Sequence, residues 1–239
     1  MTGLPRVPGA ELMDEPGVDP AELARSLHDL REVNRWLQGT RVVLRHLARM
    51  AARLPALDFT VLDVATGSAD IPLAVSRWAR ARGGRARVVA TDFHAGTLAL
   101  AREHAARDPD VRVEEADARA LPYADGAFDF SLCSTALHHF DEEDAVRVLR
   151  ELDRVAARGV VVSDFRRSRG SLLGVQLLAA TVWRGHPVTR HDGPVSIRRA
   201  YTPAEVRALA EAAGIRGARV YTHLPFRLAL VVDRTRGAG

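Results

Sequence analysis

Three aspartates, Asp63, Asp92 and Asp117, stand at or just after the ends of short apolar stretches. If these stretches are parallel strands, their carboxyl ends open into one crevice, where ligands of such sheets bind. An acid at the end of the second strand can accept hydrogen bonds from both hydroxyls of a ribose. Asp92 therefore predicts an adenosine-containing ligand, without deciding which one.

The turn after the first predicted strand narrows the choice of ligand. It lies in "VLDVATGSAD", residues 61–70, where Ala65 and Ala69 stand at positions that could hold glycine and only Gly67 remains. A pyrophosphate needs a glycine-rich turn and a bare helix N-terminus. S-adenosylmethionine has no phosphate but carries an ammonium and a sulfonium, which Asp63 can face. A plain turn-capping role for Asp63 stays open.

The elements that must position these acids follow from hydrophobic periodicity. Residues 20–53 carry apolar positions at helical spacing, with Gly39 separating two predicted helices. From residue 60, strands and helices alternate, which predicts a parallel sheet covered on both faces. The predicted strands are 60–65, 86–93, 111–117, 127–136 and 159–165, and the helices between them are 68–81, 95–107 and 141–156.

After Phe165 this alternation stops. An apolar helix over 171–183 and a polar loop over 184–200 are predicted. A capped helix follows, with Thr202 as N-cap and Glu205 at the box position. Two strands, 217–224 and 227–233, lie so close around Pro225 that they predict an antiparallel hairpin. The fold class is α/β, a Rossmann-like, seven-stranded, mostly parallel sheet with an antiparallel last strand and helices on both faces.

The predicted organisation is an irregular leader, 1–19, and a single domain, 20–239. Within the domain we expect N-terminal helices over 20–56 and a cofactor-binding core over 57–165. A helical cap insertion over 166–200 and a C-terminal helix with closing hairpin over 201–235 complete it. We expect the apolar helix of the insertion to form a lid over an apolar or aromatic acceptor. The alternative is that this helix is buried in the core or forms a dimer interface.

Composition excludes several classes of function. The 239 residues are 47% hydrophobic and 27% charged, as in ordinary globular proteins. The net charge of +4 comes with no lysine, and the arginines are interleaved with acids, so no nucleic-acid partner is expected. A single Cys133 excludes an internal disulfide and favours a cytoplasmic location. No apolar stretch is long enough for a membrane span. Peripheral membrane contact by the cap helix and the oligomeric state, a homodimer included, stay open.

Four stretches together resemble a known family: "VLDVATGSAD", "VVATDFHAGTLALA", "VEEADARALPYADGAFDFSLCSTALHHF" and "VLRELDRVAARGVVVSDF". They resemble the class I S-adenosylmethionine-dependent methyltransferases, and the third is similar to the ubiquinone/menaquinone-type branch. The resemblance implies S-adenosyl-L-methionine as cofactor. It implies a methionyl site, a ribose and adenine site and a sulfonium-facing wall, built from Asp63, Ala65, Thr66, Gly67, Asp92, Phe93, Asp117, Ala118, Ser134 and Leu137.

Histidines near the predicted crevice are the candidate general bases. Methyl transfer to a hydroxyl benefits from a base with a pKa near neutral, which histidine supplies. His138 and His139 follow the fourth strand, and His191 lies in a dense polar context. No H-E-x-x-H motif occurs and the lone cysteine lies in a strand, so no metal is expected.

The sequence thus predicts a methyltransferase for a small aromatic, quinol or lipid-like acceptor, with O-methylation slightly favoured over C-methylation. A cofactor-binding protein of the same fold that does not methylate, such as a pericyclase or a regulatory subunit, is the alternative. A nicotinamide dehydrogenase is disfavoured by the missing glycines.

Overall fold

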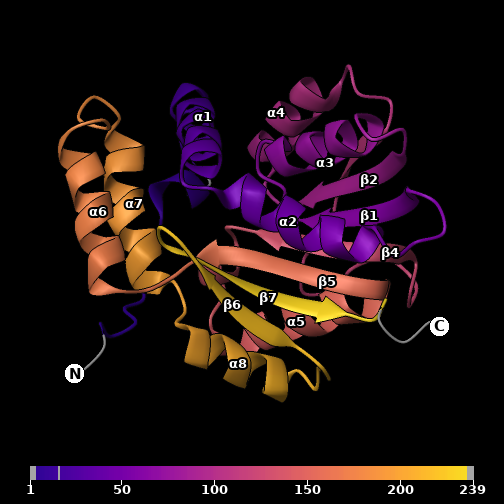
Figure 1. The fold of residues 1–239 in the computed structure, drawn as a ribbon. Coiled ribbons are helices and arrows are strands. Elements are labelled where there is room, and N and C mark those ends of the chain that lie inside the picture. The colour runs from indigo at the N-terminus through magenta and orange to yellow at the C-terminus, as the bar shows by residue number, and fades with distance from the viewer. Residues whose placement is uncertain (1–3, 16, 236–239) are drawn as a thin grey trace.

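A seven-stranded sheet forms the centre of the molecule (Figure 1). The structure is a computed structural model and describes residues 4–15 and 17–235. The strand order is β3-β2-β1-β4-β5-β7-β6, and only β7 runs antiparallel to its neighbours. This confirms the predicted fold class. The strands are β1 Asp58–Val64, β2 Arg85–Asp92, β3 Val111–Glu115, β4 Phe128–Ser134, β5 Ala156–Phe165, β6 Arg219–His223 and β7 Arg227–Asp233.

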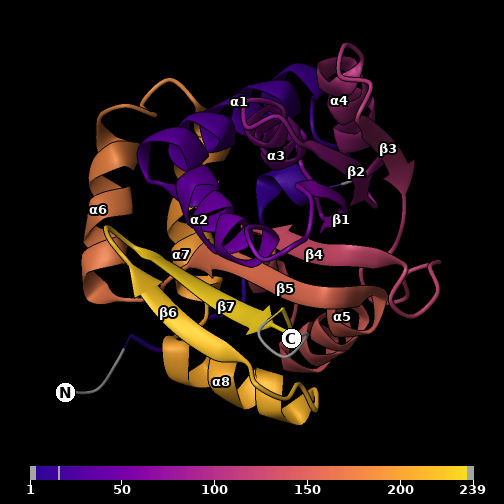
Figure 2. The ribbon, with the colours of Figure 1, turned by 45° about the vertical axis from the view of Figure 1, so that its right-hand side comes forward.

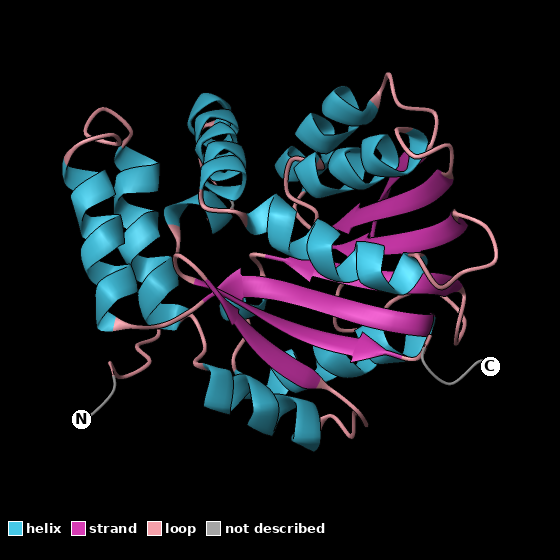
Figure 3. Cartoon of the chain, viewed as in Figure 1, coloured by secondary structure: helices cyan, strands magenta, loops and turns pink. Residues whose placement is uncertain are grey.

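Helices cover both faces of the sheet, as Figure 3 shows by secondary structure. One apolar cluster joins α5 and α8 to one face, and a second joins α2 and α3 to the other. The central strands are apolar on both sides because both faces are covered. The helices are α1 Pro20–Trp36, α2 Gly39–Ala51, α3 Asp70–Arg80, α4 Ala95–Ala105, α5 Glu142–Val155, α6 Arg169–Ala180, α7 Pro187–Arg199 and α8 Pro203–Ala212.

Most local predictions agree with the structure. The break between the first two helices falls at Leu37 and Gln38, just before Gly39, and Gln38 adopts a left-handed φ of 63°. Thr202 and Glu205 form the complete capping box at the start of α8. Strands β6 and β7 form the predicted antiparallel hairpin.

The polar loop predicted for 184–200 is wrong, because most of it is the helix α7. Its internal Gly193 and Pro194 disfavour a helix by local propensity, whereas Pro187 stands in the first turn, where proline is tolerated. Tertiary contacts override that preference: Val188, Asp192 and Ile197 are buried. Both carboxylate oxygens of Asp192 accept backbone hydrogen bonds, at 2.8 Å from Leu12 N and 3.0 Å from Met13 N.

Helices α6 and α7 pack side by side and stand beyond the ends of the central strands (Figure 2). Helix α1 contacts α7, so these helices and the strand ends enclose a common space. The N-terminal segment 4–15 runs along this part of the molecule and contains only a short 3-10 helix, Leu12–Asp14. Among the described residues, no helix is both long and apolar enough to cross a membrane.

Candidate active site

A cavity of about 600 Å³ lies where β1, β2, β3 and β4 end. Its walls come from the turns after these strands, from α1, α6 and α7, and from the N-terminal segment. It therefore lies where open α/β sheets bind ligands. Of the predicted site residues, these line it: Asp63, Ala65, Thr66, Gly67, Asp92, Phe93, Asp117, Ala118, Ser134, His138 and His139.

The turn after β1 has an unusual backbone. Ala65, Gly67 and Ala69 all have left-handed φ values, 55°, 57° and 59°. Glycine adopts this conformation freely, whereas alanine pays about 1–2 kcal/mol for it. The two alanines therefore adopt backbone conformations that favour glycine, and the turn is strained at both positions. Such strain is typical of ligand sites.

Asp63 is buried beneath this turn with an incomplete set of partners. One carboxylate oxygen accepts a hydrogen bond from Thr66 Oγ1 at 2.6 Å, and the other, Oδ1, has none. Burial raises the pKa of Asp63 to about 8, although the Thr66 bond opposes the shift. A buried carboxylate without a positive partner is costly. The site therefore fits a cationic ligand group.

Asp92 is held in place by the backbone around it. Its Oδ1 accepts hydrogen bonds from Phe93 N at 2.9 Å and His94 N at 3.1 Å, and its Oδ2 accepts one from Gly67 N at 3.0 Å. Burial raises its pKa, and these three amides oppose the shift. Each carboxylate oxygen keeps acceptor capacity for a hydroxyl.

The predicted adenine side is more open. The ring of Phe93 is 67% exposed, which leaves a flat apolar surface beside Asp92. Asp117 already pairs with Arg119, whose Nη2 lies 2.8 Å from its Oδ2, and this hydrogen bond lowers the pKa of Asp117. A ligand amine would have to share the carboxylate with Arg119. Ala118 is buried next to it.

Ser134 and Leu137, which were predicted to share one wall, lie in different surroundings in the structure. Ser134 lies on the cavity wall at the end of β4, as predicted. Leu137 is completely buried in the core cluster beneath α5 and does not line the cavity, so its predicted place on the wall is wrong. The reason is the short 3-10 turn Leu137–His139, which directs the apolar side chain inward and His139 outward.

A buried polar network that the sequence analysis missed closes one wall of the cavity. Asn34 Nδ2 donates to Asp70 Oδ2 at 3.1 Å, and Asn34 Oδ1 accepts from Arg227 Nη2 at 2.9 Å. Thr135 Oγ1 lies between them, 2.7 Å from Arg227 Nη1. Burial raises the pKa of Asp70 and lowers that of Arg227 to about 10. Asn34, the only asparagine of the chain, was the one available signal.

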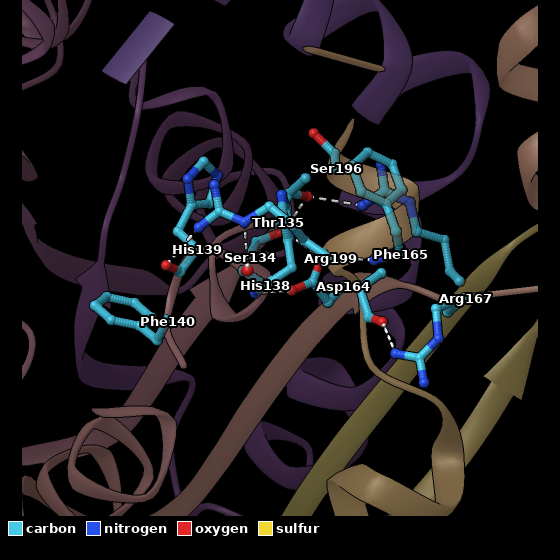
Figure 4. Close-up of polar contacts among 12 residues, drawn as sticks. Ser134, Thr135, His138, His139, Phe140, Asp164, Phe165, Arg167, Ser196 and Arg199 are labelled. Atoms are coloured by element: carbon cyan, nitrogen blue, oxygen red, sulfur yellow. Dashed lines mark hydrogen bonds and ion pairs between the residues drawn. The ribbon is translucent and has the colours of Figure 1, made fainter. Parts of the chain in front are cut away.

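His138 is completely buried and lies near two carboxylates, and Figure 4 shows it beside one of them, Asp164. Its Nδ1 lies 2.8 Å from Asp164 Oδ1, and its Nε2 lies 3.5 Å from Glu11 Oε1. Burial alone would lower the pKa of His138, but Asp164 and Glu11 outweigh it and raise the pKa to about 10. Carboxylates therefore face both ring nitrogens of His138, so neither nitrogen is free for another hydrogen-bond partner.

His139 and Glu11 complete this group. His139 Nδ1 lies 2.7 Å from Asp14 Oδ2, and its Nε2 lies 3.8 Å from Glu11 Oε2. Glu11 is 2% exposed; burial raises its pKa, but His139 and His138 outweigh this and lower it to about 2. The leader thus contributes a charged side chain to the cavity, which no sequence pattern indicated.

His191, the third predicted base, is not on the cavity wall. It lies on α7, its side chain is 47% exposed, and its Nδ1 lies 2.8 Å from Oδ1 of neighbouring Asp192. The buried positions of α7 include Val188, Asp192 and Ser196, at four-residue spacing, and His191 falls outside that row. The structure therefore contradicts its placement at the reaction centre.

The cap helices bring apolar side chains to the cavity, next to polar ones of α7 such as Thr189 and Ser196. Helix α6 lines it with one face and leaves Leu173 and Leu177 of the other face exposed. The cap helix is thus a cavity wall, as the lid prediction requires. Apolar side chains from α1, α6, α7 and the β6–β7 turn meet there: Leu30, Val33, Val175, Leu178, Ile197 and Phe226.

Comparisons with known proteins agree with this geometry. A family model described as a methyltransferase domain matches residues 61–159. A demethylmenaquinone methyltransferase of Thermus thermophilus is 36% identical over 166 residues, which cover 64% of this chain and 73% of that protein. A ubiquinone/menaquinone biosynthesis C-methyltransferase of Bdellovibrio bacteriovorus is 36% identical over 108 residues, 44% of this chain and 43% of that protein.

Among solved structures, a SAM-dependent methyltransferase from Aquifex aeolicus has the same fold, with a TM-score of 0.64 at 22% identity over 91% of this chain and 99% of its own. The chain belongs to the class I S-adenosylmethionine-dependent methyltransferases, in their ubiquinone/menaquinone-type branch. It is a methyltransferase, and its cofactor is S-adenosylmethionine. The unpartnered Oδ1 of buried Asp63 fits the cationic character of that cofactor.

Proposed function

We propose that this protein methylates a ring carbon of a small quinol-type aromatic acceptor that carries an apolar substituent. One observation carries the proposal: a single cavity joins the acidic turn of Asp63 and Asp92 to an apolar wall built by the cap helices. The acids suit the cofactor, and the apolar wall suits an acceptor with little charge. Alignment in a site that excludes water is most of what such a transfer needs.

S-adenosylmethionine, when bound, supplies the methyl group on its sulfonium. In our proposal, Asp63 accepts hydrogen bonds from the ammonium of the methionyl part, and the turn through Ala65, Thr66 and Gly67 follows that part. Asp92 accepts the ribose hydroxyls. On the adenine side, Phe93 lies against the ring, Asp117 accepts from the exocyclic amine and the backbone of Ala118 donates to a ring nitrogen. Ser134 lines the sulfonium side.

We propose that a carbon is methylated, whereas the sequence alone slightly favoured an oxygen. The slight preference for O-methylation has no support among the relatives, one of which is named a C-methyltransferase. A ring carbon next to a quinol hydroxyl becomes nucleophilic when that hydroxyl loses its proton. His138 is a poor base for this step because carboxylates face both of its ring nitrogens.

An acceptor assay tests the proposal. The protein is incubated with S-adenosylmethionine and a reduced demethyl-naphthoquinol, with a short and with a long apolar tail. Formation of S-adenosylhomocysteine is followed, and the product is assigned by mass spectrometry and NMR. We expect a new carbon-bound methyl group. A methoxy product would refute C-methylation. Tight S-adenosylhomocysteine binding with no transfer to any phenol or quinol tried would favour the pericyclase or regulatory alternative.

A further inference from the structure

Glu11, His138 and His139 bring three potential metal ligands together on the cavity wall. One ligand atom from each of them lies within 4.8 Å of the other two. The Nε2 atoms of His138 and His139 lie 3.5 Å and 3.8 Å from the two carboxylate oxygens of Glu11. Ligands bound to one zinc ion at about 2.0–2.1 Å stand roughly this far apart. The same two imidazoles pack with their centroids 4.4 Å apart.

The far nitrogens of the two histidines are both bound to carboxylates. His138 Nδ1 lies 2.8 Å from Asp164 Oδ1, and His139 Nδ1 lies 2.7 Å from Asp14 Oδ2. A carboxylate that accepts from Nδ1–H fixes the tautomer whose Nε2 carries a lone pair, as metal-bound histidines require. Two histidines oriented in this way, with their Nε2 atoms near the same glutamate, form a ligand set together with the groups that orient it.

The local charge also leaves room for a cation. The carboxylates of Glu11, Asp14 and Asp164 surround the two imidazoles. Among the described residues, the nearest fixed positive charge at Glu11 is Arg199, whose Nη1 lies 3.8 Å from Oε1. Arg199 also donates through Nε and Nη2 to the backbone carbonyls of His138 and His139. Arg227 likewise places a positive charge near Asp164. Three carboxylates against these two arginines leave a deficit of one positive charge when both imidazoles are neutral.

We propose that Glu11, His138 and His139 bind one divalent transition metal, with zinc favoured by the donor set. Two imidazoles and one carboxylate with a fourth position open is the ligand set of catalytic zinc sites. This departs from the expectation that no metal would bind. That expectation rested on the absence of metal-binding motifs, whose ligands lie close in sequence. Glu11 and His138 lie far apart in sequence, and only the fold brings them together.

The position of the site suggests its role, and this step rests on the proposed function. The three ligands line the same cavity as the apolar acceptor wall. A quinol hydroxyl in the fourth position would lose its proton to water more readily, because a bound metal stabilises the oxyanion. The metal would then supply the activation, because both ring nitrogens of His138 are engaged.

Metal binding can be measured without acceptor or cofactor. Untagged protein is stripped with a chelator and titrated with Zn²⁺ alone, and separately with Co²⁺ alone. We expect one tightly held Zn²⁺ per chain by elemental analysis, and visible Co²⁺ absorption of a four-coordinate site. The variants Glu11→Gln and His139→Asn should each weaken Zn²⁺ binding at least 10–100-fold. The control His191→Asn removes a histidine that does not line the cavity and should bind Zn²⁺ like the wild type.

A second pair of histidines needs its own control. His46 and His223 approach each other away from this cavity, with their Nε2 atoms 3.0 Å apart. Zinc bound between them would be lost in His46→Gln and kept in Glu11→Gln. Failure of the stripped wild type to bind either metal, or unchanged binding in Glu11→Gln and His139→Asn, would overturn the site. Methyl transfer at full rate by metal-free protein would overturn the activating role alone, and a bound metal without any methyl transfer would overturn the proposed function alone.

Discussion

The backbone N–H of Gly67 donates a hydrogen bond to Oδ2 of Asp92 across 3.0 Å. This bond ties the turn after β1 to the end of β2, so the loop that would follow the methionyl part and the acid that would hold the ribose move as one unit. Together with the amides of Phe93 and His94, it orients Asp92 before any ligand arrives. Preorganisation of this kind lowers the cost of binding.

Replacing Asp92 by alanine should weaken S-adenosylhomocysteine binding by about 10–100-fold. The change removes the acceptor for the ribose hydroxyls, which costs about 1–3 kcal/mol of binding free energy. The three backbone N–H groups also lose their partner, which lowers the stability of the free and the bound protein alike. Isothermal titration calorimetry measures the effect. Asp58→Asn is the matched control, since Asp58 lies at the other end of β1 in an exposed pair with Arg87. Equal affinity of Asp92→Ala and wild type would remove the ribose assignment.

The buried Asp63 should make stability and cofactor binding depend on pH. Folding raises its pKa from about 4 to about 8, so the folded state favours the protonated carboxyl. This contribution to stability is complete below about pH 4 and is lost as the pH rises toward about 8. Because a cationic ligand stabilises the ionised form, S-adenosylmethionine should raise the melting temperature more at about pH 8.5 than at about pH 6.

The variant Asp63→Asn tests this pH dependence. It keeps the size of the side chain but cannot ionise, so its ligand-induced melting shift should be smaller and nearly the same at both pH values. Thermal unfolding of both proteins, with and without S-adenosylmethionine, provides the measurement. A wild-type shift that stays constant with pH would show that Asp63 does not face the cationic part of the ligand.

Two adjacent leucines of α6 separate the acceptor wall from the outer surface. Leu178 lines the cavity, whereas Leu177 is 64% exposed on the outer face of the same helix. Leu178→Trp should fill acceptor space and raise the acceptor KM at least about 10-fold, an effect of about 1.4 kcal/mol, while S-adenosylhomocysteine affinity stays within a factor of about two. Leu177→Trp should leave both quantities unchanged. Steady-state kinetics that show the same KM for both variants would argue against an acceptor pocket beneath α6.

Gly39 should tolerate no side chain, because Asn34 and Arg227 fill the space beside it. A Cβ there would lie 2.5 Å from Asn34 Oδ1 and 2.9 Å from Arg227 Nη2. Gly39→Ala should therefore lower the free energy of unfolding by about 1–3 kcal/mol, despite the better helix propensity of alanine. Gly185→Ala, which meets nothing within 4 Å, should change it by less than about 0.5 kcal/mol. Urea denaturation compares the two, and equal stabilities would mean that the Asn34–Arg227 network yields easily.

The parts of the site that sequence predicts are those governed by local rules. Asp63 and Asp92 could be placed because the ends of neighbouring parallel strands meet at one edge of a sheet. Leu137 was misplaced because neighbouring residues of a 3-10 turn point in different directions. A shift of one residue decides whether a side chain faces the cavity or the hydrophobic core. Helix α7 was missed because its buried contacts outweigh the internal Gly193 and Pro194 of its sequence.

The remainder depends on long-range contacts. Glu11 meets His138 and His139, and Arg227 meets Asn34, only after the whole chain has folded. No spacing rule links residues so far apart, and the sequence predicted only an irregular leader over 1–19. The domain boundaries, the cytoplasmic location and the oligomeric state stay predictions.

The contact between Asn34 and Arg227 spans 193 positions of the chain. During synthesis, α1 leaves the ribosome long before β7 exists, so the wall that both build is completed last. Contacts between such distant segments form slowly because a large loop must close first. A chain still being translated therefore holds the turn of Gly67 and the acid of Asp92 but not a closed cavity. The cavity is therefore complete only once β7 has joined α1.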